Sequence, residues 1–138
     1  MGEYSVFTRS VDIDRDLNTV ADFIKKTTNL PQWTHFFVEV GEFVDDYYLV
    51  ETKMGLAQTR IEPEPINGNG SKSFIIRSQF GERLETAKID VEPKNLTTFV
   101  TFHIGLPNIL PADKVELMLN DLQSELYTLK GLLEKEFS

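Results

Sequence analysis

The sequence predicts an α+β protein in which one strand, two helices and six further strands precede a long C-terminal helix. Two observations support this class. Segments rich in β-branched and aromatic residues are separated by turn residues, as in consecutive antiparallel strands. The stretch after Pro111 instead repeats apolar residues at helical spacing along its whole length. A helix with such a stripe must cover a broad apolar surface, and a curved antiparallel sheet supplies one.

The N-terminal part changes its period within a short distance. Residues 4–11 carry β-branched and aromatic side chains and predict the first strand. Residues 14–26 then predict an amphipathic helix, with Asp14 as its cap and Asp16 in its first turn. Leu17 begins the apolar face of this helix.

A second, short helix is predicted over residues 29–34. Asn29 can cap it, and Pro31 suits a first turn because its missing N–H has no helical partner there. This segment holds Trp33, the only tryptophan of the chain. We therefore expect the indole either to anchor the helix on the sheet or to border a pocket.

Six strands follow, and turn residues separate them. The expected strands span residues 36–43, 47–54, 56–61, 73–80, 84–91 and 96–104. Between the third and fourth of these, the run Asn67-Gly68-Asn69-Gly70 predicts a mobile loop. With the N-terminal strand, these segments predict an antiparallel sheet of about seven strands.

The C-terminal segment predicts a long helix that Pro111 opens and whose first turn contains Asp113. One face of it is apolar and consists of Val115, Met118, Leu119, Leu122, Leu126, Leu129 and Leu133. We interpret its carboxylates, among them Glu116, Asp121 and Glu125, as a solvated face. The sequence has no repeat or linker, so residues 1–138 are expected to form a single domain.

Composition excludes several classes of function. The 138 residues contain no cysteine and two histidines, which rules out thiolate-bound metals and thiol nucleophiles. We expect no metal site and no cofactor. A net charge of −8 repels phosphate backbones, so nucleic acid is not an expected partner. Apolar runs are too short to span a bilayer and no secretory signal is visible, so we expect a cytoplasmic protein.

This order of elements resembles the SRPBCC superfamily, the helix-grip proteins that include START lipid-transfer domains, birch pollen allergens and polyketide cyclase/dehydrase-like proteins. The resemblance covers nearly the whole chain, and Trp33 after Asn29-Leu30-Pro31 is its most specific part. The segments 13–24 and 125–134 also carry it. It implies a seven-stranded sheet wrapped around the terminal helix, with an apolar cavity between them and a mouth near the second helix.

The residue pattern gives an independent reason for a cavity. A long apolar stripe opposite a curved sheet is hard to fill with side chains, and unfilled apolar volume favours an apolar ligand. Strand alternation predicts inward-facing residues on three strands, Ala87, Ile89, Val91, Val100 and Ile104 among them. The predicted ligand-binding residues are Trp33, Met54, Arg60, Phe74, Ile76, Phe80, Phe102, Met118 and Leu122.

No set of catalytic residues can be assigned from the sequence. His35 could move a proton near neutral pH, but no group that would orient it can be named. His103 is out of phase with the inward residues and is expected on the convex face, in solvent. Arg60 and Glu62 would serve only if they pointed inward, where Arg60 could clamp a ligand carboxylate.

Three functions therefore remain open. The first is the binding, with or without transport, of a small hydrophobic ligand such as a lipid, polyketide, isoprenoid or aromatic compound. The second is a cyclase- or dehydratase-type enzyme that uses the same cavity. The third is a protein-interaction module with a filled core. The sequence leaves the oligomeric state open as well.

Overall fold

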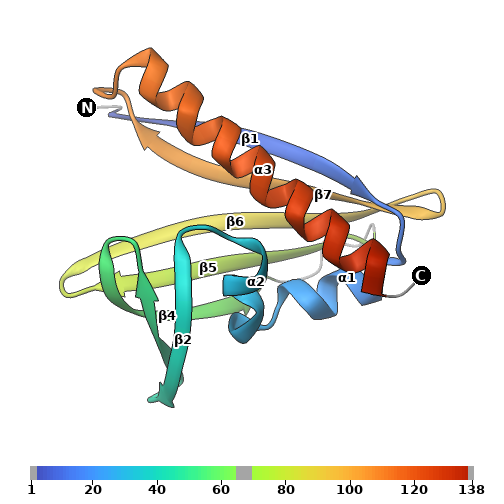
Figure 1. Cartoon of the computed structure of the whole chain (residues 1–138), viewed down its shortest axis with the longest axis horizontal. Coiled ribbons are helices and arrows are strands. Elements are labelled where there is room, and N and C mark those ends of the chain that lie inside the picture. The colour runs from blue at the N-terminus through green and yellow to red at the C-terminus, as the bar shows by residue number, and fades with distance from the viewer. Residues whose placement is uncertain (1–2, 65–69, 137–138) are drawn as a thin grey trace.

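The computed structural model describes residues 3–64 and 70–136, and its elements follow the predicted order (Figure 1). The helices are α1 (Leu17–Ile24), the 3-10 turn η1 (Thr27–Asn29), α2 (Leu30–Trp33) and α3 (Ala112–Glu136). The strands are β1 (Tyr4–Ile13), β2 (Phe37–Val44), β3 (Tyr47–Thr52), β4 (Gly55–Pro63), β5 (Lys72–Phe80), β6 (Arg83–Lys94) and β7 (Thr97–Pro107). Most of the predicted loop 67–70 lies outside the described residues.

All strands form one antiparallel sheet of seven in the order β1-β7-β6-β5-β4-β3-β2. Consecutive strands pair as hairpins, and the sheet is completed where β1 pairs with β7, from Tyr4 opposite Pro107 to Ile13 opposite Thr98. The sheet curves strongly, so that β2, β3 and β4 turn away from the plane of β1 and β7 (Figure 1). This curvature leaves one concave face for the helices.

The N-cap of helix α1 lies two residues after the predicted one. Asp16, not Asp14, is the N-cap, and its carboxylate accepts hydrogen bonds from the backbone N–H and the hydroxyl of Thr19. The backbone N–H of Asp14 donates instead to Glu134 Oε2 of α3 at 2.8 Å. The prediction of Asp14 as the cap was wrong because that residue still belongs to the turn that ties β1 to the end of α3.

Helix α2 follows Asn29, as predicted, but the Asn29 side chain does not cap it. Its amide donates to the carbonyl oxygen of Phe23 and its oxygen accepts from Gln32. Asn29 therefore holds α2 against the end of α1. This arrangement lets the following turn deliver His35 to the side of α3.

Helix α3 crosses the concave face diagonally (Figure 1) and contacts β1 and α2. Its apolar stripe forms the centre of the core, where Leu126, Leu129 and Leu133 are fully buried. They pack with inward residues of the sheet such as Ile89 and Val100. No described helix is long and apolar enough to cross a membrane.

His103 lies on the convex face, as predicted, but it is not simply solvated. Its Nε2 atom lies 2.7 Å from Asp90 Oδ2, and Asp90 also accepts a hydrogen bond from Ser73. Burial alone would raise the pKa of Asp90, but the hydrogen bonds from Ser73 and His103 hold it below its usual range. The expectation of a solvated imidazole was wrong because the adjacent strand supplies a partner.

Candidate functional site

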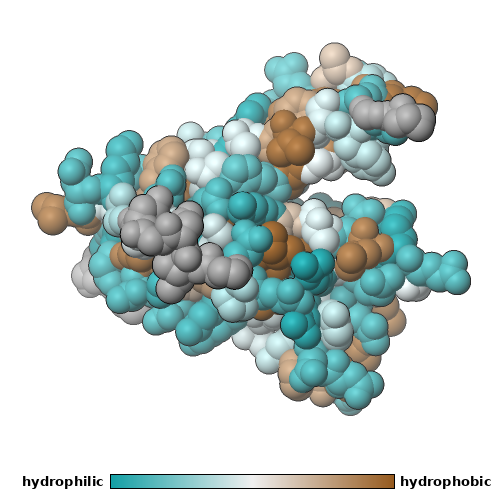
Figure 2. Space-filling model, turned by 180° about the vertical axis from the view of Figure 1, so that it is seen from behind, coloured by the Kyte–Doolittle hydropathy of each residue, from teal (hydrophilic) through white to brown (hydrophobic). Residues whose placement is uncertain are grey.

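The sheet opens between β6 and β7. These strands pair only from Lys94 opposite Thr97 to Lys88 opposite His103. Beyond that point β7 continues with β1 as far as Pro107, while β6 continues with β5 as far as Arg83. The two halves of the sheet diverge here, and Figure 2 shows the resulting cleft at one edge of the molecule.

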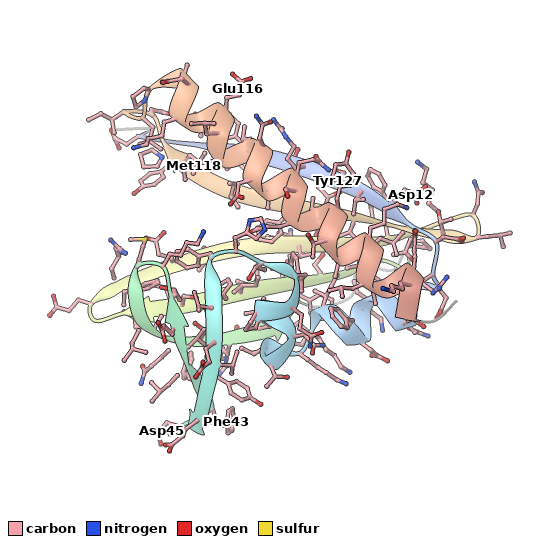
Figure 3. The ribbon with its side chains drawn as sticks, in the orientation of Figure 1. Asp12, Phe43, Asp45, Glu116, Met118 and Tyr127 are labelled. Atoms are coloured by element: carbon pink, nitrogen blue, oxygen red, sulfur yellow. The ribbon has the colours of Figure 1, made fainter. Side chains whose placement is uncertain are left out.

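A pocket of about 330 Å³ lies inside this opening, between the sheet and the N-terminal half of α3. We call it the apolar cleft, because its lining is mostly hydrophobic. Its apolar lining consists of Phe36, Phe37, Met54, Ile76, Ala87, Phe102, Ile104, Leu106, Met118 and Leu122. In Figure 3, Met118 projects from α3 toward the opening, whereas Glu116 points away from it.

Acidic side chains supply the charged groups of the apolar cleft. Asp121 and Glu125 of α3 and Glu85 of β6 belong to its lining, and no lysine or arginine in the described part of the chain does. Spaced four residues apart, Asp121 and Glu125 lie on one side of the helix. Polar hydroxyls come from residues such as Thr34 and Ser78.

His35 lies beside these two carboxylates. Its Nδ1 atom is 2.7 Å from Asp121 Oδ1 and 3.8 Å from Glu125 Oε2. Its backbone N–H donates to Glu125 Oε2 at 2.6 Å. The imidazole therefore has the orienting groups that could not be named from the sequence, because they lie on α3, far along the chain.

Glu125 is the buried member of this group, with only 8% of the residue exposed. Burial raises the pKa of its carboxyl, and the neighbouring charge of Asp121 adds to the rise, against the lowering effect of the backbone hydrogen bonds from His35 and Phe36. The expectation that the α3 carboxylates form a solvated face was wrong for Glu125. The sequence did indicate its position, because Glu125 follows Met118 by seven residues and therefore lies on the same helix face.

One donor atom from each of His35, Asp121 and Glu125 can be chosen so that all lie within 4.8 Å of one another. Imidazole and carboxylate are common ligands of divalent metals. The direct contact between His35 Nδ1 and Asp121 Oδ1 also accounts for the cluster without an ion. We therefore treat it as a polar group at the wall of the cleft.

The structure brings five of the nine predicted ligand-binding residues together. Met54, Ile76, Phe102, Met118 and Leu122 all belong to the lining of the apolar cleft. They come from four separate elements or turns, so their convergence depends on the fold. Contact with a ligand stays a prediction for each of them.

Two other predicted residues border a different hollow. Phe74 and Arg60 line an open depression of about 880 Å³, beside charged residues such as Lys25 and Lys26. Arg60 is engaged elsewhere, since its guanidinium lies 2.7 Å from Glu62 Oε2 and stacks over the ring of Tyr47. Its register partners show that it lies on the outer face, away from the apolar cleft.

The remaining two predicted residues pack in or near the core. Trp33 is almost fully buried, and its ring meets that of Phe102 edge-on at 6.1 Å. Phe80 packs edge-on against Phe36 at 6.3 Å, with the guanidinium of Arg83 over its ring. Each therefore packs against a residue that lines the cleft.

No protein-family model and no curated protein matches the sequence. Solved structures do match the fold. A START superfamily protein from Mycobacterium smegmatis is 14% identical with a TM-score of 0.66, over 94% of this chain and 97% of that one. The Aha1 dimer from Colwellia psychrerythraea is 13% identical with a TM-score of 0.65, over 94% and 96% of the two chains.

A third structure extends this set. Ara h 8.0201 is 11% identical with a TM-score of 0.59, over 96% of this chain and 99% of that one. At these identities the likeness concerns the fold. With its seven-stranded antiparallel sheet and long C-terminal helix, the chain has the helix-grip fold, as its sequence resemblance implied.

Proposed function

We propose that the protein binds a small hydrophobic molecule in the apolar cleft. The observation that carries the proposal is an accessible pocket whose walls are mostly apolar, set between the sheet and α3. Removing apolar surface from water favours binding by about 25 cal/mol per Å². A pocket of about 330 Å³ is at the lower end of the size range of small-molecule sites.

The composition of the walls also supports this function. Met54 and Met118, from opposite sides of the opening, are partly exposed and line the cleft. Thioether side chains adapt to different ligand shapes because they are unbranched and polarizable. We therefore expect the cleft to accept apolar molecules of related size rather than one exact shape.

The proposal can be tested by filling the cleft. Ala87 is a partly buried lining residue on β6, and an Ala87→Trp side chain would occupy space that the ligand needs. We expect this variant to weaken binding of the neutral fluorophore N-phenylnaphthylamine by at least about tenfold in a fluorescence titration, a loss of about 1.4 kcal/mol.

Leu96→Trp is the matched control. Leu96 lies at the β6–β7 turn and is 91% exposed, so the same indole is added away from the cleft. We expect this variant to bind the fluorophore as the unmodified protein does. Saturable binding that survives Ala87→Trp in a folded protein would place the site elsewhere, and an absence of saturable binding in the unmodified protein would refute the proposal.

A further inference from the structure

We propose that the apolar cleft selects ligands whose hydrophobic body carries a cationic group, in particular an amine, and discriminates against fatty-acid-like carboxylates. This inference rests on the proposed function, since it concerns the same site. It depends on the positions of Asp121 and Glu125, and on the absence of lysine and arginine from the described lining of the cleft.

The Glu125 carboxylate is costly in its position. Its side chain is 10% exposed, and the only basic side chain that contacts it among the described residues is His35, whose Nδ1 lies 3.8 Å from Oε2. A buried carboxylate is costly unless it is paired, because the protein interior solvates charge poorly. The pKa of Glu125 is raised accordingly, chiefly by burial.

Glu125 has hydrogen-bonding capacity that its protein partners do not fill. Its Oε2 accepts the backbone N–H of His35, and a backbone hydrogen bond from Phe36 also stabilises the carboxylate. An ionised carboxylate has about four acceptor positions on its two oxygens. An ammonium group offers three donors and a full positive charge, and so complements the positions that the backbone leaves open.

The charge around the apolar cleft is negative. Asp121 is 52% exposed beside the opening, and Glu85 on the opposite wall is in an exposed pair with Arg83. The net charge of the whole chain is −8. A carboxylate-bearing ligand would enter against this field, whereas an amine would be attracted by it.

The two carboxylates of α3 lie beside the apolar wall of the cleft. Asp121 and Glu125 flank Leu122 on α3, and Leu122 lines the cleft together with Phe102 of β7. The charged groups therefore lie next to the apolar wall and not at a separate surface patch. A ligand can place its hydrophobic body against the sheet while its amine reaches the two carboxylates.

The test uses three probes with the same alkyl chain and different head groups, which are decylamine, decan-1-ol and decanoate. Isothermal titration calorimetry at neutral pH and below the micellar concentrations gives each affinity. We expect decylamine to bind at least about tenfold more tightly than decanoate, with decan-1-ol between them, because a tenfold ratio is a modest electrostatic difference of about 1.4 kcal/mol. The preference for decylamine should shrink in about 0.5 M salt.

The double variant Asp121→Asn/Glu125→Gln keeps the shapes of the side chains and removes their charge. We expect its affinities for decylamine and decan-1-ol to become equal within about twofold, while the affinity for decan-1-ol is unchanged. The control Asp113→Asn/Glu116→Gln removes the same charge from exposed positions of α3 outside the lining, and Glu116 points away from the cleft (Figure 3). This control variant should retain the preference for decylamine.

The outcomes separate the two proposals. Equal binding of all three probes, tighter binding of decanoate, or a preference that survives the double variant would overturn the cationic selectivity and leave hydrophobic binding in place. If none of the three probes binds saturably, the binding function of the cleft fails, and the selectivity fails with it.

Discussion

Trp33 is a predicted ligand-binding residue that lies next to the lining of the apolar cleft and is not part of it. Its indole is buried against Phe102, which itself lines the apolar cleft. The indole Nε1–H has no hydrogen-bond partner among the described residues, so its contribution is the packing of its rings. Trp33 therefore shapes the cleft from behind, as a support for its wall.

Substitution of Trp33 should separate packing from hydrogen bonding. We expect Trp33→Ala to lower the free energy of unfolding by about 3–5 kcal/mol, because a large buried side chain is lost. Trp33→Phe should cost under about 2 kcal/mol, since a ring remains and no bonded N–H is removed. Urea unfolding measures both. Equal losses in the two variants would mean that the indole N–H has a partner.

Glu125 gives a pH dependence whose sign follows from its environment. Its folded-state pKa is raised above the ordinary glutamate value of about 4.5, so the folded protein holds this proton at pH values where the unfolded chain has released it. The contribution of Glu125 to the free energy of unfolding is therefore highest below pH 4.5. It falls as the pH rises from 4.5 through the raised pKa, and it is constant above the raised pKa.

We expect Glu125→Gln to remove this component. Plotted against pH, the unfolding free energy of the unmodified protein should fall relative to that of Glu125→Gln across this window. The exposed Glu116→Gln should give a curve parallel to the unmodified protein. Asp121 faces Glu125 and its charge adds to the rise in the Glu125 pKa, so Asp121→Asn should reduce the effect without abolishing it. A curve for Glu125→Gln that runs parallel to the unmodified protein would contradict this account.

Among the elements, β6 and β7 decide where the site lies. β6 pairs with β5 over residues 83–91 and β7 pairs with β1 over residues 98–107, but they pair with each other only over residues 88–94 and 97–103. Strand backbones have strong donors and acceptors along both edges. The divergence therefore exposes one edge of each strand at the opening, with residues of the apolar cleft between them.

Amide hydrogen exchange should detect this difference within single strands. We expect residues 84–87 and 104–107 to exchange at least about tenfold faster than residues 89–91 and 100–102 of the same strands, because the free edges open at lower cost. Residue-resolved NMR provides the measurement. Uniform protection along β6 and β7 would show that the opening is closed in solution.

For the molecule as a whole, the fold was predictable because its signals are local. The strand alternation, the turn residues and the apolar stripe of α3 each act within a few residues, and together they restrict the topology strongly. The predicted strand cores agree with the structure, with ends displaced by a few residues. Pairing adds hydrogen bonds that extend β1, β6 and β7 past their apolar segments.

The site was less predictable because its parts are distant in sequence. Met54 and Met118 converge on one pocket, and His35 meets Asp121 across most of the chain. Arg60 could clamp a ligand carboxylate only if it pointed inward, and the register places it on the outer face beside Glu62. A face assignment depends on pairing, which no local pattern determines.

The central claim is that the apolar cleft holds a small hydrophobic molecule. Native mass spectrometry of protein purified gently and without detergent, with organic extraction of the same sample, tests this most directly. We predict a bound molecule in one-to-one stoichiometry that is released on denaturation and is absent from Ala87→Trp. A native mass for each protein equal to that of its own bare chain, together with an empty extract, would contradict the claim.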